Sequence, residues 1–496
     1  MANLTLILLY TGAVTILSYL KGIWSTVIPA HGGADWPFAY YFVALRVILR
    51  PQHFFASIYA STADAVVRIP APGAWDNVLS FNSAVDQMFQ SRWTLHGSRS
   101  VFEHPIHLAA MSKALGRNLD RCMPDLYDEV VHACEEAFSA MGEDKWRSVD
   151  ATTLSHFLVA RTNNRVFVGL PFCRDPQYTA HTIGLPSRLF VRGSLVRMIP
   201  EFLRPYLARF VSGQQRELGA AIAFLRPILE QHAEQHRQSQ ESGNPTVDRD
   251  LITSLLDALP ADERTVEELA VRIMLTNTLP ATFNTNNALT ALLYDLADYP
   301  EYIPAIRAEA HRLLRTRAGA AVSAPTKAEL DSMPHLERFI RESQRLNGTS
   351  AGALFRRVVA PNGFVFSDGV HIPHGAVICV PGMASVTDNA NYADASTFNP
   401  YRSTAGARAA STSLTHLTFG HGRQACPGRF FTVVQLKLLL AYIVLHFDIR
   451  PGWGDGDEDG KRPKDVFLRF LRFPSMAGKC WCGGGRSGLP RRIVLV

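Results

Sequence analysis

The residues with the clearest chemical potential lie in a glycine-rich segment that ends at a cysteine: Phe419-Gly420-His421-Gly422-Arg423-Gln424-Ala425-Cys426-Pro427-Gly428. Gly420 and Gly422 allow the chain to turn tightly beneath a flat ligand, and Pro427 suits the first turn of the apolar helix that follows. Cys426 is therefore expected at a helix N-terminus, where backbone N–H groups and the helix dipole favour the thiolate. A lone thiolate on such a loop is suited to be an axial ligand of iron. The alternative is that Cys426 is a buried apolar residue.

A second candidate constellation is the pair Glu342 and Arg345. Residues three apart on a helix lie on one face, so the carboxylate and the guanidinium can form a bidentate salt bridge. The alternative is a solvated surface contact, which contributes little to stability.

The two motifs together resemble the cytochrome P-450 family, whose haem-binding loop has the pattern Phe, two residues, Gly, three residues, Cys, one residue, Gly. Phe419, Gly422, Cys426 and Gly428 match that pattern in place. The resemblance implies that this loop binds haem b, with the Cys426 thiolate as the axial ligand of its iron. The family usually has a basic residue two positions before the cysteine. Here Gln424 stands at that position, with Arg423 beside it, and both are assigned to the cofactor-binding loop.

The same resemblance assigns roles to three arginines. In the family the Glu-x-x-Arg pair is buried and closed by a second arginine, and Arg402 of Phe398-Asn399-Pro400-Tyr401-Arg402 supplies it here. Glu342, Arg345 and Arg402 are thus expected to form a structural triad that supports the haem pocket. Arg356 resembles the arginine that binds a haem propionate, with Arg357 as the neighbouring alternative.

The helix before Tyr294 resembles the family's oxygen-activating helix but departs from its usual pattern. Asn284 stands at the position of the usual threonine and Phe283 at that of the usual acid. An amide donates and accepts hydrogen bonds but does not pass protons as an alcohol does with water. Thr285 and Thr282 are the alternative hydroxyls for proton delivery. The structural alternative is that residues 283–285 merely pack the helix.

The resemblance implies a haem-thiolate monooxygenase, an oxidoreductase that inserts one oxygen atom from O2 into a hydrophobic small molecule. Electrons would come from NADPH through NADPH-cytochrome P-450 reductase, with cytochrome b5 as a further donor. Segments 164–175 and 293–297 resemble the fungal secondary-metabolism branch. That branch commonly oxidises terpenoid, indole-diterpenoid or polyketide skeletons.

Two other functions stay open from the sequence. Phe283 and Asn284 suggest a haem-thiolate enzyme that catalyses rearrangement, dehydration, desaturation or oxidative ring formation. A non-catalytic haem-binding sensor or carrier is disfavoured because the chain carries no attached output domain.

The elements that must position these residues are mainly helical. Pro280 should distort the helix of Asn284, because proline lacks the N–H that a helix interior needs. Strand-like segments are short, at 364–366 and 377–380, and the fold class is mainly α with small β-sheets. Helical periodicity extends over several long segments: 125–138, 207–234, 266–297, 327–346 and 427–446.

The N-terminal segment predicts a membrane anchor. Residues 2–20 carry no charge and are long enough for one membrane-spanning helix. We expect an anchor at 1–22, a membrane-proximal interfacial segment at 23–67 and a catalytic domain at 68–496. Basic residues after the span place that domain on the cytosolic side of a single-pass protein, in the endoplasmic reticulum membrane if the resemblance holds. A cleaved signal peptide is the alternative.

Composition agrees with a large globular protein. The chain has 496 residues, of which 47% are hydrophobic and 19% charged, which excludes disordered, collagenous and disulfide-framework classes. Its seven scattered cysteines are typical of reduced thiols facing the cytosol. The formal charge of +6 is spread along the chain, so nucleic-acid binding is disfavoured, whereas docking to an acidic protein or an anionic membrane is compatible with it.

Overall fold

The structure is a computed structural model, and it does not describe every residue of the chain. The expected anchor at 1–22 lies outside the described residues, as does the membrane-proximal segment at 23–67 except for residues 50–61. The described residues are 50–61, 105–117, 119–139, 146–198, 206, 214–242, 251–315, 324–367, 369–402, 406–453, 462, 465–468, 471–473, 482–483 and 491–495.

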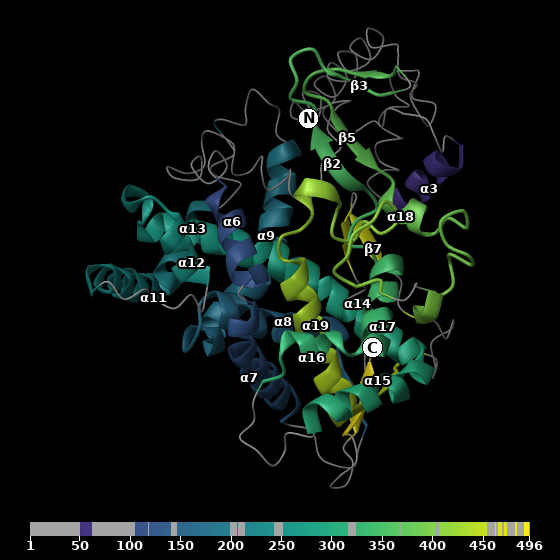
Figure 1. Ribbon diagram of the computed structural model, residues 1–496, viewed down its shortest axis with the longest axis horizontal. Coiled ribbons are helices and arrows are strands. Elements are labelled where there is room, and N and C mark those ends of the chain that lie inside the picture. Colours follow the sequence, from purple (N-terminus) through teal and green to yellow (C-terminus); the bar gives the residue numbers. More distant parts are fainter. Residues whose placement is uncertain are drawn as a thin grey trace, which may run out of the picture.

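Four helices form the centre of the helical body (Figure 1): α7 (Leu119–Phe138), α8 (Ala151–Phe167), α14 (Asn284–Asp298) and α19 (Arg429–His446). Helix α8 packs against α7 and α14, and α19 packs against α7 and α14 as well. Among the described helices only α19 is long and apolar enough to span a membrane, but 72% of it is buried inside the protein. We therefore identify α19 as a core helix.

Further helices surround this centre. On one side lie α6 (Ile106–Ser112), α9 (Pro176–Met198), α11 (Gln214–Ser242), α12 (Leu251–Ala258) and α13 (Val266–Thr276). The other side carries α15 (Ile303–Ala310), α16 (Lys327–Asp331) and α17 (Pro334–Leu346), while α3 (Pro51–Ser61) packs against α18 (Gly382–Val386).

The helix boundaries follow local chemistry. The Asp150 carboxylate accepts a hydrogen bond from the Thr153 N–H at 2.5 Å and so caps α8. The segment 327–346, expected as one helix, is divided into α16 and α17 because Pro334 begins a new helix after a two-residue break. Helix α11 reaches Ser242, eight residues beyond the end of the helical segment expected at 207–234. Arg237 pairs with Glu234 and Glu241 on that last part of the helix.

The strands are few and short, as expected. A four-stranded sheet has the order β1-β9-β10-β6, from Arg147–Val149, Cys482–Gly483, Arg491–Leu495 and Phe447–Pro451. Three two-stranded antiparallel pairs complete the described strands: β2 (Ala353–Arg357) with β5 (Val377–Val380), β3 (Phe364–Val365) with β4 (His371–Ile372), and β7 (Val466–Leu468) with β8 (Leu471–Phe473). The prediction of a mainly helical fold with small sheets is confirmed.

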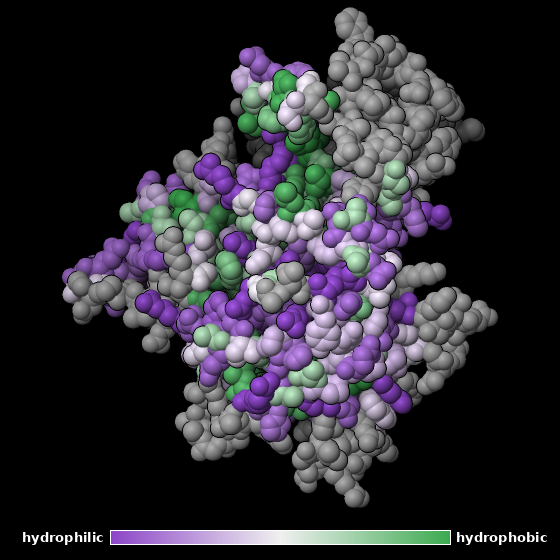
Figure 2. All heavy atoms as spheres, turned by 45° about the vertical axis from the view of Figure 1, so that its right-hand side comes forward, coloured by the Kyte–Doolittle hydropathy of each residue, from purple (hydrophilic) through white to green (hydrophobic). Residues whose placement is uncertain are grey.

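The β2–β5 and β3–β4 strands lie together at one end of the molecule and expose apolar side chains. Figure 2 shows hydrophobic residues gathered at the upper end, where Figure 1 places these strands. Val359, Phe364 and Val365 are 76%, 47% and 57% exposed. A cluster of exposed apolar residues of this kind is typical of a contact surface.

The helix that carries Asn284 is not uniform. It runs from α13 through a π-helical turn, η4 (Asn277–Phe283), into α14. Pro280 lies inside the π turn and is exposed. The distortion expected from Pro280 therefore takes the form of a wide turn within a continuous helix.

Candidate active site

Cys426 lies at the end of a closed loop that leads into α19. Its backbone N–H donates to the Phe419 carbonyl at 2.8 Å, and the Ala425 N–H donates to the Gly422 carbonyl at 3.1 Å. A short 3-10 turn, η8 (Gly422–Gln424), lies between them. These bonds fix the cysteine two residues before the helix cap, Gly428, so Cys426 lies near the helix N-terminus as expected, but Pro427 precedes the cap and does not lie in the first turn.

The backbone conformation and the surroundings of this loop explain its glycines. Gly420 and Gly422 have φ angles of 70° and 72°, a left-handed region that disfavours other residues. A Cβ at Gly422 would meet no described heavy atom within 4 Å, so open space lies beside the loop there. At Gly428 a Cβ would lie 3.8 Å from Met111 Cε and 4.0 Å from Cys426 Sγ, so glycine keeps the sulfur's surroundings uncrowded.

The environment of Cys426 acts on its protonation in two directions. Burial raises the pKa of the Cys426 thiol, whereas the backbone N–H groups of Gly428 and Arg429 and the Arg429 charge lower it. Arg429 Nη1 also donates to the Cys426 carbonyl at 2.7 Å, which holds the guanidinium near the loop. Because a metal cation deprotonates a coordinating thiol outright, these N–H groups are placed to support a metal-bound thiolate.

The donor set fits haem better than an ion held by protein side chains alone. Among the described residues, no group of three or more His, Cys, Asp or Glu side chains could hold a metal ion. A single cysteine beside an open glycine loop matches an iron whose other ligands come from a porphyrin.

Helix α6 adds a polar group that the sequence did not reveal as part of a haem site. His107 Nδ1 is buried and has no hydrogen-bond partner within the described part of the chain. Burial and the nearby Arg272 charge lower the pKa of His107 to about 4. Met111 of the same helix packs against Gly428. An unpartnered ring nitrogen near an arginine fits an anionic group such as a haem propionate, but a lone histidine gives no sequence pattern.

Strand β2 brings Arg356 toward the cysteine loop. The Leu354 side chain lies 3.9 Å from the position of a Cβ on Gly420, and Leu354 itself has a φ of 53°. Arg356 is partly buried, and its Nη1 donates to the Phe355 carbonyl at 2.8 Å. The alternative, Arg357, is exposed and donates to the Gly375 carbonyl at 3.0 Å. Arg423 and Gln424 are also exposed.

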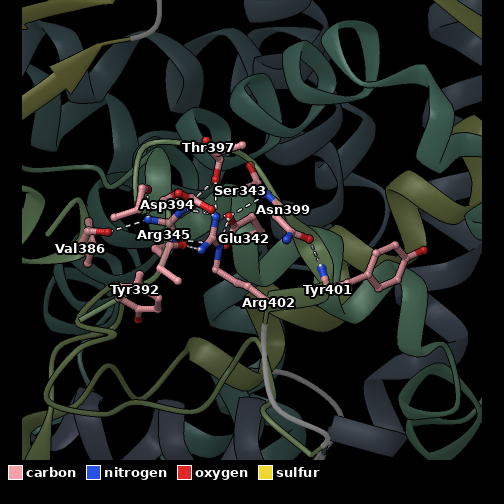
Figure 3. Close-up of polar contacts among 12 residues, drawn as sticks. Glu342, Ser343, Arg345, Val386, Tyr392, Asp394, Thr397, Asn399, Tyr401 and Arg402 are labelled. Atoms are coloured by element: carbon pink, nitrogen blue, oxygen red, sulfur yellow. Dashed lines mark hydrogen bonds and ion pairs between the residues drawn. The ribbon is translucent and has the colours of Figure 1, made fainter. Parts of the chain in front are cut away.

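Glu342, Arg345 and Arg402 form a buried cluster, drawn in Figure 3. Arg345 Nε and Nη2 donate to the two carboxylate oxygens of Glu342 at 2.9 and 2.8 Å, and Arg402 Nε donates to Glu342 Oε1 at 2.8 Å. The Asn399 N–H reaches the same oxygen at 2.9 Å. Both guanidiniums also donate to carbonyls of the segment 386–397. The cluster thus locks α17 to the chain that precedes the cysteine loop.

The candidate distal residues occupy different environments. Ala281, Asn284 and Ala288, spaced three and four residues apart, are partly exposed although the residues between them are buried. Asn284 is the polar member of this stripe. Thr285 is 2% exposed. Thr282 is fully buried, and its hydroxyl donates to the Asn277 carbonyl at 3.0 Å.

A cysteine that leads into a buried core helix and a buried Glu-Arg-Arg cluster, together in a mainly helical fold, are the features of a haem-thiolate protein. The cytochrome P-450 family model matches residues 124–470, and the chain belongs to that family. Haem with thiolate-ligated iron is therefore its cofactor, as the sequence predicted. The fold agrees: the crystal structure of the cytochrome P-450DA haem domain aligns with a TM-score of 0.58 at 17% identity, over 86% of this chain and 92% of that one.

Fungal enzymes are among the relatives of this chain. Cytochrome P-450 monooxygenase 151 of Postia placenta is 31% identical, over 82% of this chain and 80% of its own. Cytochrome P-450 monooxygenase janQ of Penicillium janthinellum is 29% identical, over 81% of this chain and 79% of its own. The predicted enzyme class, an oxidoreductase of the cytochrome P-450 monooxygenase type, is confirmed, as is the likeness to the fungal secondary-metabolism branch.

Proposed function

We propose that this chain is a monooxygenase that oxidises a hydrophobic secondary metabolite of the terpenoid, indole-diterpenoid or polyketide class. It would use O2 and electrons from NADPH, delivered by NADPH-cytochrome P-450 reductase, with cytochrome b5 as a further donor. The observation that carries the proposal is the place of Cys426 at the entry of α19, between an open glycine loop and two backbone N–H groups. Haem, when bound there, supplies the activation of O2 and the oxidation of the substrate.

The chain's own residues have holding and orienting roles. Cys426 would bind the iron, and Phe419, Gly422 and Gly428 would shape the loop beneath the macrocycle. His107 and Arg356 would hold the propionates, one from α6 and one from β2. Each offers nitrogen donors on an element that touches the loop through Met111 or Leu354.

On the distal side, Asn284 would orient a hydrogen-bonding partner rather than pass a proton. Its amide is the polar group on the partly exposed stripe of the helix, and an amide nitrogen is not acidic. Thr285 is the next residue in the sequence, and its hydroxyl is the candidate for proton delivery through water.

The same residues favour one alternative: rearrangement, dehydration, desaturation or oxidative ring formation by a haem-thiolate enzyme. Residues 277–288 contain no acid, so the helix offers no carboxyl at the usual position, and Phe283 is buried there instead. Rearrangement and dehydration consume no O2 and therefore need no proton delivery to oxygen, whereas desaturation and oxidative ring formation still need it. Dependence of turnover on NADPH and reductase would separate oxidative reactions from isomerisation.

Exposed residues near the cysteine loop and at β3 support the proposed partners. Arg423 is exposed in the cysteine loop, and Leu414 and Phe430 are 79% and 39% exposed near it in sequence. An exposed arginine with exposed apolar side chains near it in sequence suits contact with an acidic electron-transfer protein. The exposed apolar residues at β3 and after β2 suit contact with a membrane, in keeping with the proposed anchor at 1–22 and a cytosol-facing domain at the endoplasmic reticulum.

The first test is the carbon monoxide difference spectrum of the reduced protein, for the wild type, Cys426→Ala and Cys379→Ala. Cys379 is a free, partly buried cysteine like Cys426, so it is a matched control. We expect the red-shifted Soret band in the wild type and in Cys379→Ala, and its loss in Cys426→Ala. A folded wild type that gave only the band of a haem without thiolate would overturn the proposal.

A further inference from the structure

A side-chain hydrogen bond joins the two ends of the π-helical turn in the distal helix. Thr282 Oγ1 donates to the Asn277 carbonyl, five residues earlier, at 3.0 Å. Five residues is the repeat of a π turn rather than of an α turn. Isolated π turns are rare and need support from their surroundings, and here Asn277 and Thr282 lie at the first and sixth of its seven residues.

Two consecutive asparagines of α8 hold the ends of this turn. Asn163 Nδ2 donates to Thr282 Oγ1 at 3.3 Å, and Asn277 Nδ2 donates to Asn164 Oδ1 at 2.8 Å. Each asparagine therefore contacts one end of the π turn. The four side chains are 0–1% exposed, so their polar atoms have no water to replace these bonds.

Neighbouring helices hold the two asparagines in turn. Gln435 of α19 donates from Nε2 to Asn163 Oδ1 at 3.0 Å and to Thr162 Oγ1 at 2.6 Å. From α9, Thr182 accepts a hydrogen bond from Asn164 Nδ2 at 3.4 Å. The π turn is thus tied through α8 to the helix that follows Cys426, and amides and hydroxyls form every link.

We propose that this network of buried amides is a positioning device for the active site, in which Asn163, Asn164 and Thr282 hold the π turn open. If the turn closed to α-helical geometry, the residues on either side of it would shift by one position, a rotation of about 100°. The stripe of Ala281, Asn284 and Ala288, whose spacing an α-helix keeps on one face, would then turn relative to α13 and to the helices packed around it. The inference rests on the proposed function, because it takes that stripe as the distal face.

In this network Thr282 holds the π turn in place and does not deliver protons. Its hydroxyl donates within the turn and accepts from Asn163 while fully buried, so both of its usual hydrogen-bonding directions are used inside the protein. Thr282 is therefore a positioning residue. Asn284 and Thr285 remain the candidates for direct hydrogen bonding and proton delivery on the distal side.

The test compares Thr282→Val with Thr282→Ser and Thr290→Val in the haem-loaded protein. Valine keeps the shape of threonine and removes the hydroxyl, whereas serine retains it. Thr290 is a matched control, because it lies fully buried on α14 and its hydroxyl has no hydrogen-bond partner among the described residues. The readouts are deuterium exchange of residues 277–288, the spin state of the ferric haem, and product formed per NADPH consumed.

We expect about five- to tenfold faster exchange in Thr282→Val, the effect of one net hydrogen bond on a local opening. A changed spin state and a lower product yield per NADPH should accompany it, while Thr282→Ser and Thr290→Val match the wild type. The proposal is wrong if Thr282→Val exchanges no faster than Thr290→Val, or if its faster exchange leaves spin state and yield unchanged. Failure of the proposed function would appear separately, as a missing red-shifted carbon monoxide band in the wild type.

Discussion

Arg345 forms a two-bond fork with Glu342, from Nε to Oε2 at 2.9 Å and from Nη2 to Oε1 at 2.8 Å, where both side chains are 2% exposed. Its remaining nitrogen, Nη1, donates to the carbonyls of Val386 and Ala395 at 2.5 and 2.6 Å. One guanidinium therefore fixes a helix and a loop at the same time. A compact ammonium cannot reproduce this planar set of donors.

We predict that Arg345→Lys weakens haem binding and lowers the free energy of unfolding by about 3 kcal/mol or more, the cost of disturbing a buried ion pair. The measurements are haem content after purification and a urea unfolding midpoint. Arg237→Lys on α11 is the control, because Arg237 is 61% exposed and its ion pairs contribute little. Equal stability of the two variants would contradict a structural role for the triad.

The buried side chain of His416, three residues before the cysteine loop in sequence, is expected to contribute to the pH dependence of stability. Its side chain is 1% exposed, and burial with the charges of Arg341 and Arg345 lowers the pKa of His416 to about 3. An unfolded histidine has a pKa of about 6.5, so between those values the unfolded state binds more protons. Stability therefore falls as the pH decreases from about 6.5 toward 3, by up to about 1.4 kcal/mol per pH unit.

We predict that His416→Gln makes this slope less steep between pH 7 and 5, because glutamine does not titrate; the slope that remains comes from other histidines with a lowered pKa, such as His107. Unfolding midpoints followed by tryptophan fluorescence at several pH values are the measurement. His374→Gln serves as the control, since His374 is exposed on the turn before β5. A wild-type stability that is constant from pH 7 to 5 would show that His416 does not stay neutral in the folded protein.

The distal helix gives a prediction that separates the two proposed reactions. Asn284 is the polar residue on the stripe of Ala281, Asn284 and Ala288, so Asn284→Leu leaves an apolar stripe, and Asn284→Thr supplies an alcohol that passes protons with water. For oxygen insertion we expect product per NADPH to fall about tenfold in the leucine variant and to be kept or raised in the threonine variant. For isomerisation without proton delivery, the threonine variant should give no gain and NADPH should be dispensable.

Motifs of fixed spacing made much of the site predictable from sequence. Phe419, Gly422, Cys426 and Gly428 lie within ten residues of one another, so their geometry is local. The long helix at 266–297 was also predictable, because its apolar periodicity continues through the π turn into α14.

The buried polar network could not be predicted, because its links are not local. Gln435 and Asn163 are separated by 272 residues, and Asn277 and Asn164 by 113. In the sequence, an amide in an apolar helix indicates only a residue that is unfavourable in a helix. Its hydrogen-bond partner can be identified only from the packed structure. His107 was not assigned to the haem site for the same reason, because its proposed role depends on where α6 meets Gly428.

The last prediction concerns Asn347, which joins the end of α17 to the β7–β8 hairpin. Arg472 donates from Nη2 to Asn347 Oδ1 at 2.8 Å and from Nη1 to the Asn347 carbonyl at 2.9 Å. Asn347 Nδ2 in turn donates to Asp295 Oδ2 at 2.8 Å, and Arg462 Nη1 donates to Asp295 Oδ1 at 2.6 Å. The side-chain amide of Asn347 is thus hydrogen-bonded to both a buried arginine, Arg472, and a buried aspartate, Asp295.

Asn347→Ala should lower the free energy of unfolding by about 2–4 kcal/mol, because it removes one hydrogen bond from each of two buried charged groups, Arg472 and Asp295. Deuterium exchange should rise at 466–473, since Arg472 is the residue through which the hairpin contacts Asn347. The matched control is Asn391→Ala, an exposed asparagine whose amide donates to the Ser385 carbonyl, for which we expect a much smaller change. If both variants lost the same small amount of stability, the hairpin would have to be held by contacts other than the Arg472–Asn347 pair.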